Sequence, residues 1–245
     1  METIASDETL DTILGGRIRV IQPRRGYRFS LDSVLLARFA NVRGRDRVLE
    51  LCAGSGVISM ILTTLHNPRE IAAIEIQPRM VSMIRRSAEL NGLKSIHAVE
   101  ADLRSRSIAG LEPASFDLVI ANPPWRAGGA GRECPEHERR ISRAESAAAL
   151  DDIVKAAARY ARDGARVALV MAAARSAELI SVMRARRLEP KRIRFVHPYA
   201  NAPASAILVE ASKGGGVETR VEPPLIVWAS ERTYTDEARA ILEQP

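Results

Sequence analysis

Hydrophobic positions along the chain fall into two alternating patterns. Short, nearly continuous apolar runs alternate with longer segments in which apolar residues recur at the spacing of one helix face. The runs predict buried strands at 47–51, 71–76, 96–101, 116–121, 165–171, 193–197 and 205–211. The amphipathic segments predict helices at 30–40, 57–65, 78–91, 144–162 and 174–187. Such alternation favours a mostly parallel sheet with helices on both faces.

The two ends of the chain depart from this alternation. Residues 14–29 alternate between apolar and polar around Gly and Pro, which predicts a short hairpin. The strands predicted at 193–197 and 205–211 leave no room for a crossover helix between them, so they must be antiparallel. A short strand at 225–228 and a helix at 235–244 follow.

These elements predict an α/β fold built on a mostly parallel, seven-stranded sheet with one antiparallel strand near the C-terminus. We expect a single domain over residues 30–245, preceded by an N-terminal extension with the hairpin over residues 1–29. A sheet of this kind binds ligands beyond the carboxyl ends of its strands, where the strand order reverses. Candidate site residues are therefore sought at those ends.

Composition narrows the class of protein. Hydrophobic residues make up 46% and charged residues 27% of the 245 positions, which is ordinary for a globular domain. No apolar run reaches the roughly 18 residues of a membrane-spanning helix, and the first residues lack the pattern of a signal peptide. The two cysteines, Cys52 and Cys134, are expected to be free thiols, which predicts a cytoplasmic location and no membrane partner.

The charge balance raises the question of an anionic partner. The formal net charge is +6, and all but four of the 36 basic residues are arginine. Biased codon usage in a GC-rich genome explains this composition, and so does a nucleic-acid partner whose phosphates match guanidinium groups. Two clusters favour the second explanation modestly. The clusters are Arg17, Arg19, Arg24, Arg25 and Arg28, and Arg184, Arg186, Arg187, Lys191, Arg192 and Arg194.

Polar residues and glycines follow the first three predicted strands. Glu50 ends the first strand, and the turn Cys52-Ala53-Gly54-Ser55-Gly56 leads into a helix, where a ligand can approach the backbone. Glu75 ends the second strand, 19 residues beyond Gly56, at the place where a carboxylate accepts ribose hydroxyls. This pair predicts a nucleoside cofactor, either a dinucleotide or S-adenosylmethionine. Asp102 follows the third strand and is placed to reach an adenine amino group.

The fourth strand ends in Asn122-Pro123-Pro124-Trp125, the most specific element of the sequence. Two prolines directly after a buried strand stop the hydrogen-bond ladder and stiffen the loop. Asn122 then presents an acceptor and a donor at a fixed place, and Trp125 offers a stacking face. A dehydrogenase has no use for this element, whereas an enzyme that methylates a planar nitrogen does.

Together these residues resemble a class I S-adenosylmethionine-dependent methyltransferase, a Rossmann-like fold. The chain is similar in particular to the bacterial tRNA(Val) adenine-N6 methyltransferase family, over roughly residues 12–242. Segments outside the general motifs carry that likeness: Tyr27-Arg28-Phe29-Ser30-Leu31-Asp32-Ser33 with the four residues after it, Phe195-Val196-His197-Pro198, Ala202-Pro203-Ala204 and Tyr234-Thr235.

The resemblance implies a role for each matched residue. The side-chain oxygen of Asn122 and the carbonyl of Pro123 would accept the two hydrogens of the target amine, and Trp125 would stack on the base. Catalysis is then mostly positioning, without a strong base. The implied partner is tRNA or another structured RNA, bound by a monomer or homodimer. The implied cofactor contacts are Asp32, Glu50, Cys52, Ala53, Gly54, Gly56, Glu75, Ile76, Asp102, Leu103 and Asn122.

Three features leave alternatives open. Cys52 stands where these enzymes usually have the first glycine of the turn, Trp125 where they usually have Tyr or Phe, and the loop 126–143 does not align. Another amino or amide nitrogen remains possible as the target: ribosomal RNA guanine N2, a release-factor glutamine or a small molecule. A non-catalytic RNA-binding module and a nicotinamide-dependent dehydrogenase fit less well. His137 has no second histidine near it, so no metal site is expected.

Overall fold

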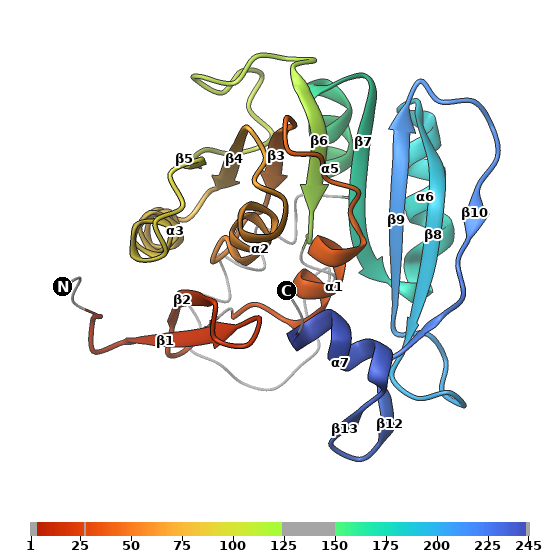
Figure 1. The fold of residues 1–245 in the computed structure, drawn as a ribbon. Helices are drawn as coiled ribbons and strands as arrows, with labels where there is room; N and C mark the ends of the chain where they lie inside the picture. Colours follow the sequence, from red (N-terminus) through yellow and green to blue (C-terminus); the bar gives the residue numbers. More distant parts are fainter. Residues whose placement is uncertain (1–3, 27, 124–149, 244–245) are drawn as a thin grey trace.

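The protein is built around one large sheet (Figure 1). The computed structural model describes residues 4–26, 28–123 and 150–243. Seven strands of the sheet follow the order β5-β4-β3-β6-β7-β9-β8. They are β3 (Arg47–Leu51), β4 (Glu70–Glu75), β5 (Ile96–Glu100), β6 (Phe116–Ala121), β7 (Ala161–Ala172), β8 (Leu188–His197) and β9 (Ala206–Lys213).

The direction of these strands confirms the predicted topology. The ladders from β5 to β7 are parallel, and β9 runs antiparallel to both β7 and β8. Two very short strands, β10 (Arg220–Val221) and β11 (Leu225–Ile226), pair in parallel with the outer edge of β8. The carboxyl ends of β3, β4, β5 and β6 therefore meet along one edge of the sheet.

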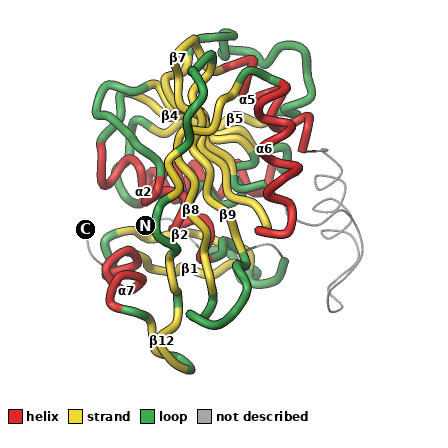
Figure 2. Tube along the Cα trace, turned by 90° about the vertical axis from the view of Figure 1, so that its right-hand side faces the viewer, coloured by secondary structure: helices red, strands yellow, loops and turns green. Residues whose placement is uncertain are grey.

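Helices cover both faces of the sheet, as Figure 2 shows with the sheet seen along its edge. Among the described residues, three helices after the hairpin cover one face and two cover the other, and each face has its own cluster of buried apolar residues. The first set is α1 (Leu31–Phe39), α2 (Val57–His66) and α3 (Pro78–Leu90). The second set is α5 (Leu150–Tyr160) and α6 (Ser176–Ala185), which follows the short 3-10 turn η1 (Ala173–Arg175). This layering confirms the expected α/β class.

Two strands are longer than their apolar runs predicted. β7 begins at residue 161 because Ala161 pairs with Phe116 of β6 before a shift in register, so the predicted helix ends earlier than residue 162. β8 begins at residue 188 because Leu188 pairs with Lys213 of β9. Charged residues alternate with the buried ones in this part of β8, which hid it from a search for apolar runs.

The N-terminal hairpin lies earlier in the chain than predicted. Its strands are β1 (Glu8–Ile13) and β2 (Ile18–Pro23), and the described residues between β2 and α1, 24–26 and 28–30, form no strand. Polar residues dominate β1, so the sequence pattern did not reveal it. The hairpin packs against α3, where the Ile21 amide donates a hydrogen bond of 2.9 Å to Ser87 Oγ. Ile18 and Val20 belong to the same apolar cluster as the helices of that face.

The C-terminal segment differs from the prediction in detail. The strand expected at 225–228 is divided between β11 and β12 (Trp228–Ser230), which forms a small hairpin with β13 (Thr233–Tyr234). The rings of Trp228 and Tyr234 stack at 4.2 Å across this hairpin. The expected final helix is α7 (Asp236–Glu243), which packs against α1. Within residues 4–26, 28–123 and 150–243, no helix has the length and apolar character needed to cross a membrane.

Candidate active site

The turn between β3 and α2 has the backbone conformation that its glycines predict. Cys52, Gly54 and Gly56 all adopt positive φ angles, of 55°, 55° and 71°. A side chain at Gly56 would approach Ile84 of α3 at 3.0 Å, so the close contact between the two helices requires glycine. Cys52 adopts the left-handed conformation although it has a side chain, which costs roughly 1–2 kcal/mol.

Glu75 holds this turn against the neighbouring strand. Its carboxylate is buried at the end of β4 and accepts three backbone N–H groups. Gly54 N–H donates to Oε2 at 2.8 Å, and the N–H groups of Ile76 and Gln77 donate to Oε1, each at 3.0 Å. The sequence predicted a ligand-binding carboxylate here. The structure adds that the same carboxylate joins the glycine turn to the start of the segment leading to α3.

Glu50 is a buried acid at the end of β3. Its Oε2 atom accepts hydrogen bonds from the backbone N–H and the hydroxyl of Ser59 on α2. Burial raises the pKa of Glu50 to about 8; the Ser59 hydrogen bonds oppose this shift, and the charge of Glu75 adds to it. Glu50 is therefore largely protonated at neutral pH, although a carboxylate at this position was the expectation from the sequence.

Asn122 is fixed at the end of β6 by a residue far away in sequence. Its Nδ2 group donates a hydrogen bond of 2.8 Å to Ser33 Oγ on α1, and both residues are buried. Pro123, two residues beyond the end of β6, is also buried. With the nitrogen side of the amide bound to Ser33, the Asn122 side-chain oxygen is left to accept a hydrogen bond.

A pocket brings these residues together at the carboxyl edge of the sheet. Its lining contains four residues predicted as cofactor contacts, Glu50, Cys52, Ala53 and Asn122. It also contains Phe29 and Ser33, from the segment that carried the family resemblance, and Ser55, Val57 and Ile58 complete the lining. The Ser55 hydroxyl is buried and has no hydrogen-bond partner among the residues that the structure describes. A buried donor left unpaired beside a pocket fits a ligand that carries acceptor groups.

The remaining predicted cofactor residues lie around this pocket rather than in its lining. Ile76, just beyond β4, is an exposed apolar residue on the same edge. Leu103 packs partly buried against the second apolar cluster. Asp32 lies in the first turn of α1 and accepts a hydrogen bond of 2.8 Å from Ser30; burial raises its pKa. Ser30, at the N-terminal cap position of α1, uses its hydroxyl for this contact and caps no backbone N–H.

Asp102 has a different partner from the one expected. Its carboxylate binds Arg104, with an ion pair of 2.6 Å to the guanidinium and a hydrogen bond of 2.9 Å from the backbone N–H. The Arg104 side-chain hydrogen bond lowers the pKa of Asp102. To accept an adenine amino group, Asp102 would have to share or release this contact.

Several predicted residues lie outside the described part of the chain. They are Pro124 and Trp125, the loop 126–143 and, within it, Cys134 and His137. Tyr27, from the segment that carried the family resemblance, also lies outside it. The stacking role of Trp125 therefore stays a prediction.

Known proteins are similar to this chain in sequence and in fold. Residues 30–186 match the family model described as the methyltransferase small domain. A tRNA1(Val) (adenine(37)-N6)-methyltransferase of Parabacteroides distasonis is 27% identical over 184 residues, which cover 74% of this chain and 75% of the relative. A protein of the same name from Tolumonas auensis is 22% identical and covers 93% of each chain.

A solved structure agrees with this match. The structure of a predicted O-methyltransferase from Agrobacterium tumefaciens superimposes with a TM-score of 0.68 at 25% identity, covering 85% of this chain and 94% of that one. The glycine turn, the strand-end glutamates and Asn122 all lie within the matched residues 30–186. The predicted class I methyltransferase fold is thus confirmed, and the chain belongs to the methyltransferase small domain family.

Proposed function

We propose that this protein is an S-adenosylmethionine-dependent methyltransferase that methylates the exocyclic N6 of adenine in tRNA. The observation that carries the proposal is Asn122, a buried amide fixed at the end of β6 beside the pocket and the glycine turn. The names of the relatives from Parabacteroides and Tolumonas support adenine N6 and tRNA as the target.

The pocket residues fit the proposed cofactor. Glu75 is placed to accept a ribose hydroxyl, and the Gly54 and Gly56 turn lets the cofactor approach the backbone. The Ser55 hydroxyl, which has no partner among the described residues, supplies a hydrogen-bond donor, and Glu50 supplies a second polar group in the lining. When bound, S-adenosylmethionine would supply an electrophilic methyl group.

Asn122 and Pro123 would position the target nitrogen. An adenine amino group carries two hydrogens, and its lone pair is delocalised into the ring. Acceptors on both hydrogens favour a more tetrahedral, more nucleophilic nitrogen, and the Asn122 side-chain oxygen and the Pro123 carbonyl are the two candidates. Because Ser33 holds the Asn122 amide in place, little reorganisation is needed when the base arrives.

The same geometry leaves other amino nitrogens as the second candidate. A guanine N2 in ribosomal RNA, a release-factor glutamine or a small-molecule amine also presents two hydrogens to a pair of acceptors. The Agrobacterium neighbour is named as acting on oxygen, and a hydroxyl presents only one hydrogen. The pair of acceptors in this protein therefore favours nitrogen.

The experiment combines methyl transfer with product identification. Wild-type protein is incubated with labelled S-adenosylmethionine and unmodified total tRNA, and the tRNA is then digested to nucleosides. We expect N6-methyladenosine as the labelled product. Label in protein, or in another nucleoside, would show that one of the alternative nitrogens is the target instead of adenine N6.

A variant of Asn122 tests the mechanism. Asn122→Ala should lower the single-turnover rate by about 10²-fold or more, as for the loss of one oriented hydrogen-bonding group. Cofactor affinity by calorimetry should change little, because the glycine turn and Glu75 remain. A near-native single-turnover rate at saturating tRNA would show that Asn122 does not carry the chemical step.

A further inference from the structure

The arginines of the cluster at residues 184–194 are neutralised within the fold. Four of them bind carboxylates at 2.5–3.1 Å: Arg184 with Glu189, Arg186 with Asp151, Arg192 with Glu210 and Glu222, and Arg194 with Glu237. Lys191 donates to the carbonyl oxygens of Gly216 and Val217. Four of the six basic residues of this cluster thus bind five carboxylates, so little net positive charge is available to a partner.

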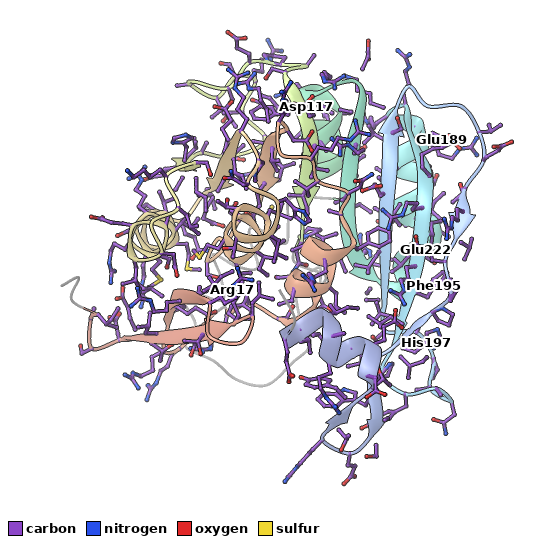
Figure 3. All side chains as sticks on the ribbon, viewed as in Figure 1. Arg17, Asp117, Glu189, Phe195, His197 and Glu222 are labelled. Carbon is purple, nitrogen blue, oxygen red and sulfur yellow. The ribbon has the colours of Figure 1, made fainter. Side chains whose placement is uncertain are left out.

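The first residues of this cluster also lie at the edge of the sheet opposite to the candidate active site. In Figure 3, Glu189 lies near the end of the molecule marked by Asp117, where the parallel strands begin. Arg184 pairs with Glu189 at that end. His197, at the carboxyl end of β8, lies at the opposite end of the molecule, which is also the edge of the candidate active site.

The hairpin cluster at residues 17–28 has the opposite charge balance. The side chains of Arg17 and Arg25 are exposed and make no hydrogen bond or ion pair with any residue in the described ranges. The guanidinium groups of Arg19 and Arg24 donate only to backbone carbonyl oxygens, which leave the positive charge uncompensated. Arg28 alone binds a carboxylate, Asp11 at 2.5 Å.

The two other acids of the hairpin segment form ion pairs with arginines outside the cluster. Asp7 binds Arg79 at 2.7 Å, and Glu8 binds Arg86 at 2.7 Å, both on α3. The three carboxylates of residues 4–26 thus bind Arg28 and two arginines of α3, and four arginines of the cluster are left without a carboxylate among the described residues. The surface of the hairpin carries an excess of positive charge that the β8 cluster lacks.

The connection from the hairpin to the active site is short. Arg25 lies four residues before Phe29, which lines the pocket, so their Cα atoms are at most about 15 Å apart. That span corresponds to about two nucleotides of an extended strand. A phosphate held near Arg25 would thus belong to the nucleotides that flank a base inserted into the pocket.

We propose that the hairpin surface formed by Arg17, Arg19, Arg24 and Arg25 binds the RNA phosphates that flank the target base, and that the cluster at 184–194 is structural. This inference rests on the proposed function, because it takes RNA as the partner. Guanidinium groups without acidic partners are the form in which arginine binds phosphate most readily.

The test compares two double variants with the same change of charge. Arg17→Gln with Arg25→Gln removes two unpaired hairpin charges, and Arg184→Gln with Arg186→Gln removes two paired charges. Binding of unmodified tRNA is measured by fluorescence anisotropy between 50 and 200 mM salt. Each lost phosphate contact lowers the slope of log affinity against log salt by ~0.7–0.9, so the hairpin variant should lose ~1.5. Between 50 and 200 mM salt, the affinity of the hairpin variant should therefore fall about eightfold less than that of the wild-type protein.

The outcomes separate this inference from the proposed function. A reduced slope for the hairpin variant, with a wild-type slope for the control variant, supports the inference. An unchanged slope for the hairpin variant, or an equal reduction in both, overturns it. If the wild-type protein transfers no methyl group to tRNA and binds it without salt dependence, the proposed function fails as well. Methyl transfer by wild-type protein with an unchanged hairpin slope overturns the inference alone.

Discussion

Replacing Glu75 tests the dual role of its carboxylate. An ionised carboxylate only accepts hydrogen bonds and offers about four lone-pair positions, three of which are occupied by the N–H groups of Gly54, Ile76 and Gln77. Glu75→Gln keeps the size of the side chain but turns one oxygen into a donor group. At least one buried N–H group then faces another donor.

The expected magnitude follows from that count. One buried N–H group left without an acceptor costs ~1–3 kcal/mol. For a chain of this length, 1 kcal/mol shifts the melting temperature by roughly 2–4 °C, so Glu75→Gln should lower it by about 2–12 °C. Glu75→Ala leaves all three donors without their acceptor and should lower it further.

Calorimetry and thermal denaturation measure the two effects separately. Glu100 is the matched control, because it pairs with Glu75 in register on β5 and is exposed. Glu100→Gln should keep the wild-type melting temperature and cofactor affinity, whereas Glu75→Gln should lose at least tenfold in affinity. In the wild-type protein, Glu75 has one lone-pair position left and can accept one ribose hydroxyl. Removing that hydroxyl should cost more affinity than removing the other, so the 2′-deoxy and 3′-deoxy cofactor analogues should bind with unequal losses. A Glu75→Gln protein with both properties unchanged would refute the reasoning.

Two further predictions concern the other buried polar groups of the site. Ser33→Ala removes the hydrogen bond to Asn122, worth ~1–1.4 kcal/mol, and should lower the single-turnover rate about 5- to 10-fold at unchanged cofactor affinity. Ser33→Thr keeps a hydroxyl and should restore the rate; equal loss in both variants would contradict a positioning role. Because the pKa of Glu50 is raised, the folded protein binds the Glu50 proton more tightly than the unfolded chain does. The stability that this proton contributes is complete below about pH 4.5 and is lost as the pH rises to about 8. Glu50→Gln is neutral throughout, so its melting temperature should fall less than that of wild type between pH 6 and 9; parallel curves would argue against a protonated Glu50.

The sequence predicted those parts of the site that depend on strand ends. Glu50, Glu75 and Asn122 each follow a buried apolar run, and parallel strands bring their carboxyl ends to one edge. Apolar runs reveal such strands because both of their faces are buried. The same reasoning placed Cys52 and the glycines in a turn that the structure confirms by their positive φ angles.

Contacts between distant residues could not be predicted in this way. The hydrogen bond from Asn122 to Ser33 joins residues 89 positions apart, and neither position has a pattern that marks its partner. The two arginine clusters look alike in sequence, yet Arg192 and Arg194 find acids 18 and 43 residues away. Whether an arginine is free or paired is decided by tertiary structure.

The packing of the hairpin on α3 has a consequence for folding during synthesis. Ile21 binds Ser87, which the ribosome adds 66 residues later. At about 5–20 residues per second, that interval lasts roughly 3–13 s. A two-stranded hairpin is marginally stable alone, so Ile18, Val20 and Ile21 stay accessible to water or chaperones until α3 emerges. The segment that leads to the active site therefore becomes stable only after α3 has been synthesised.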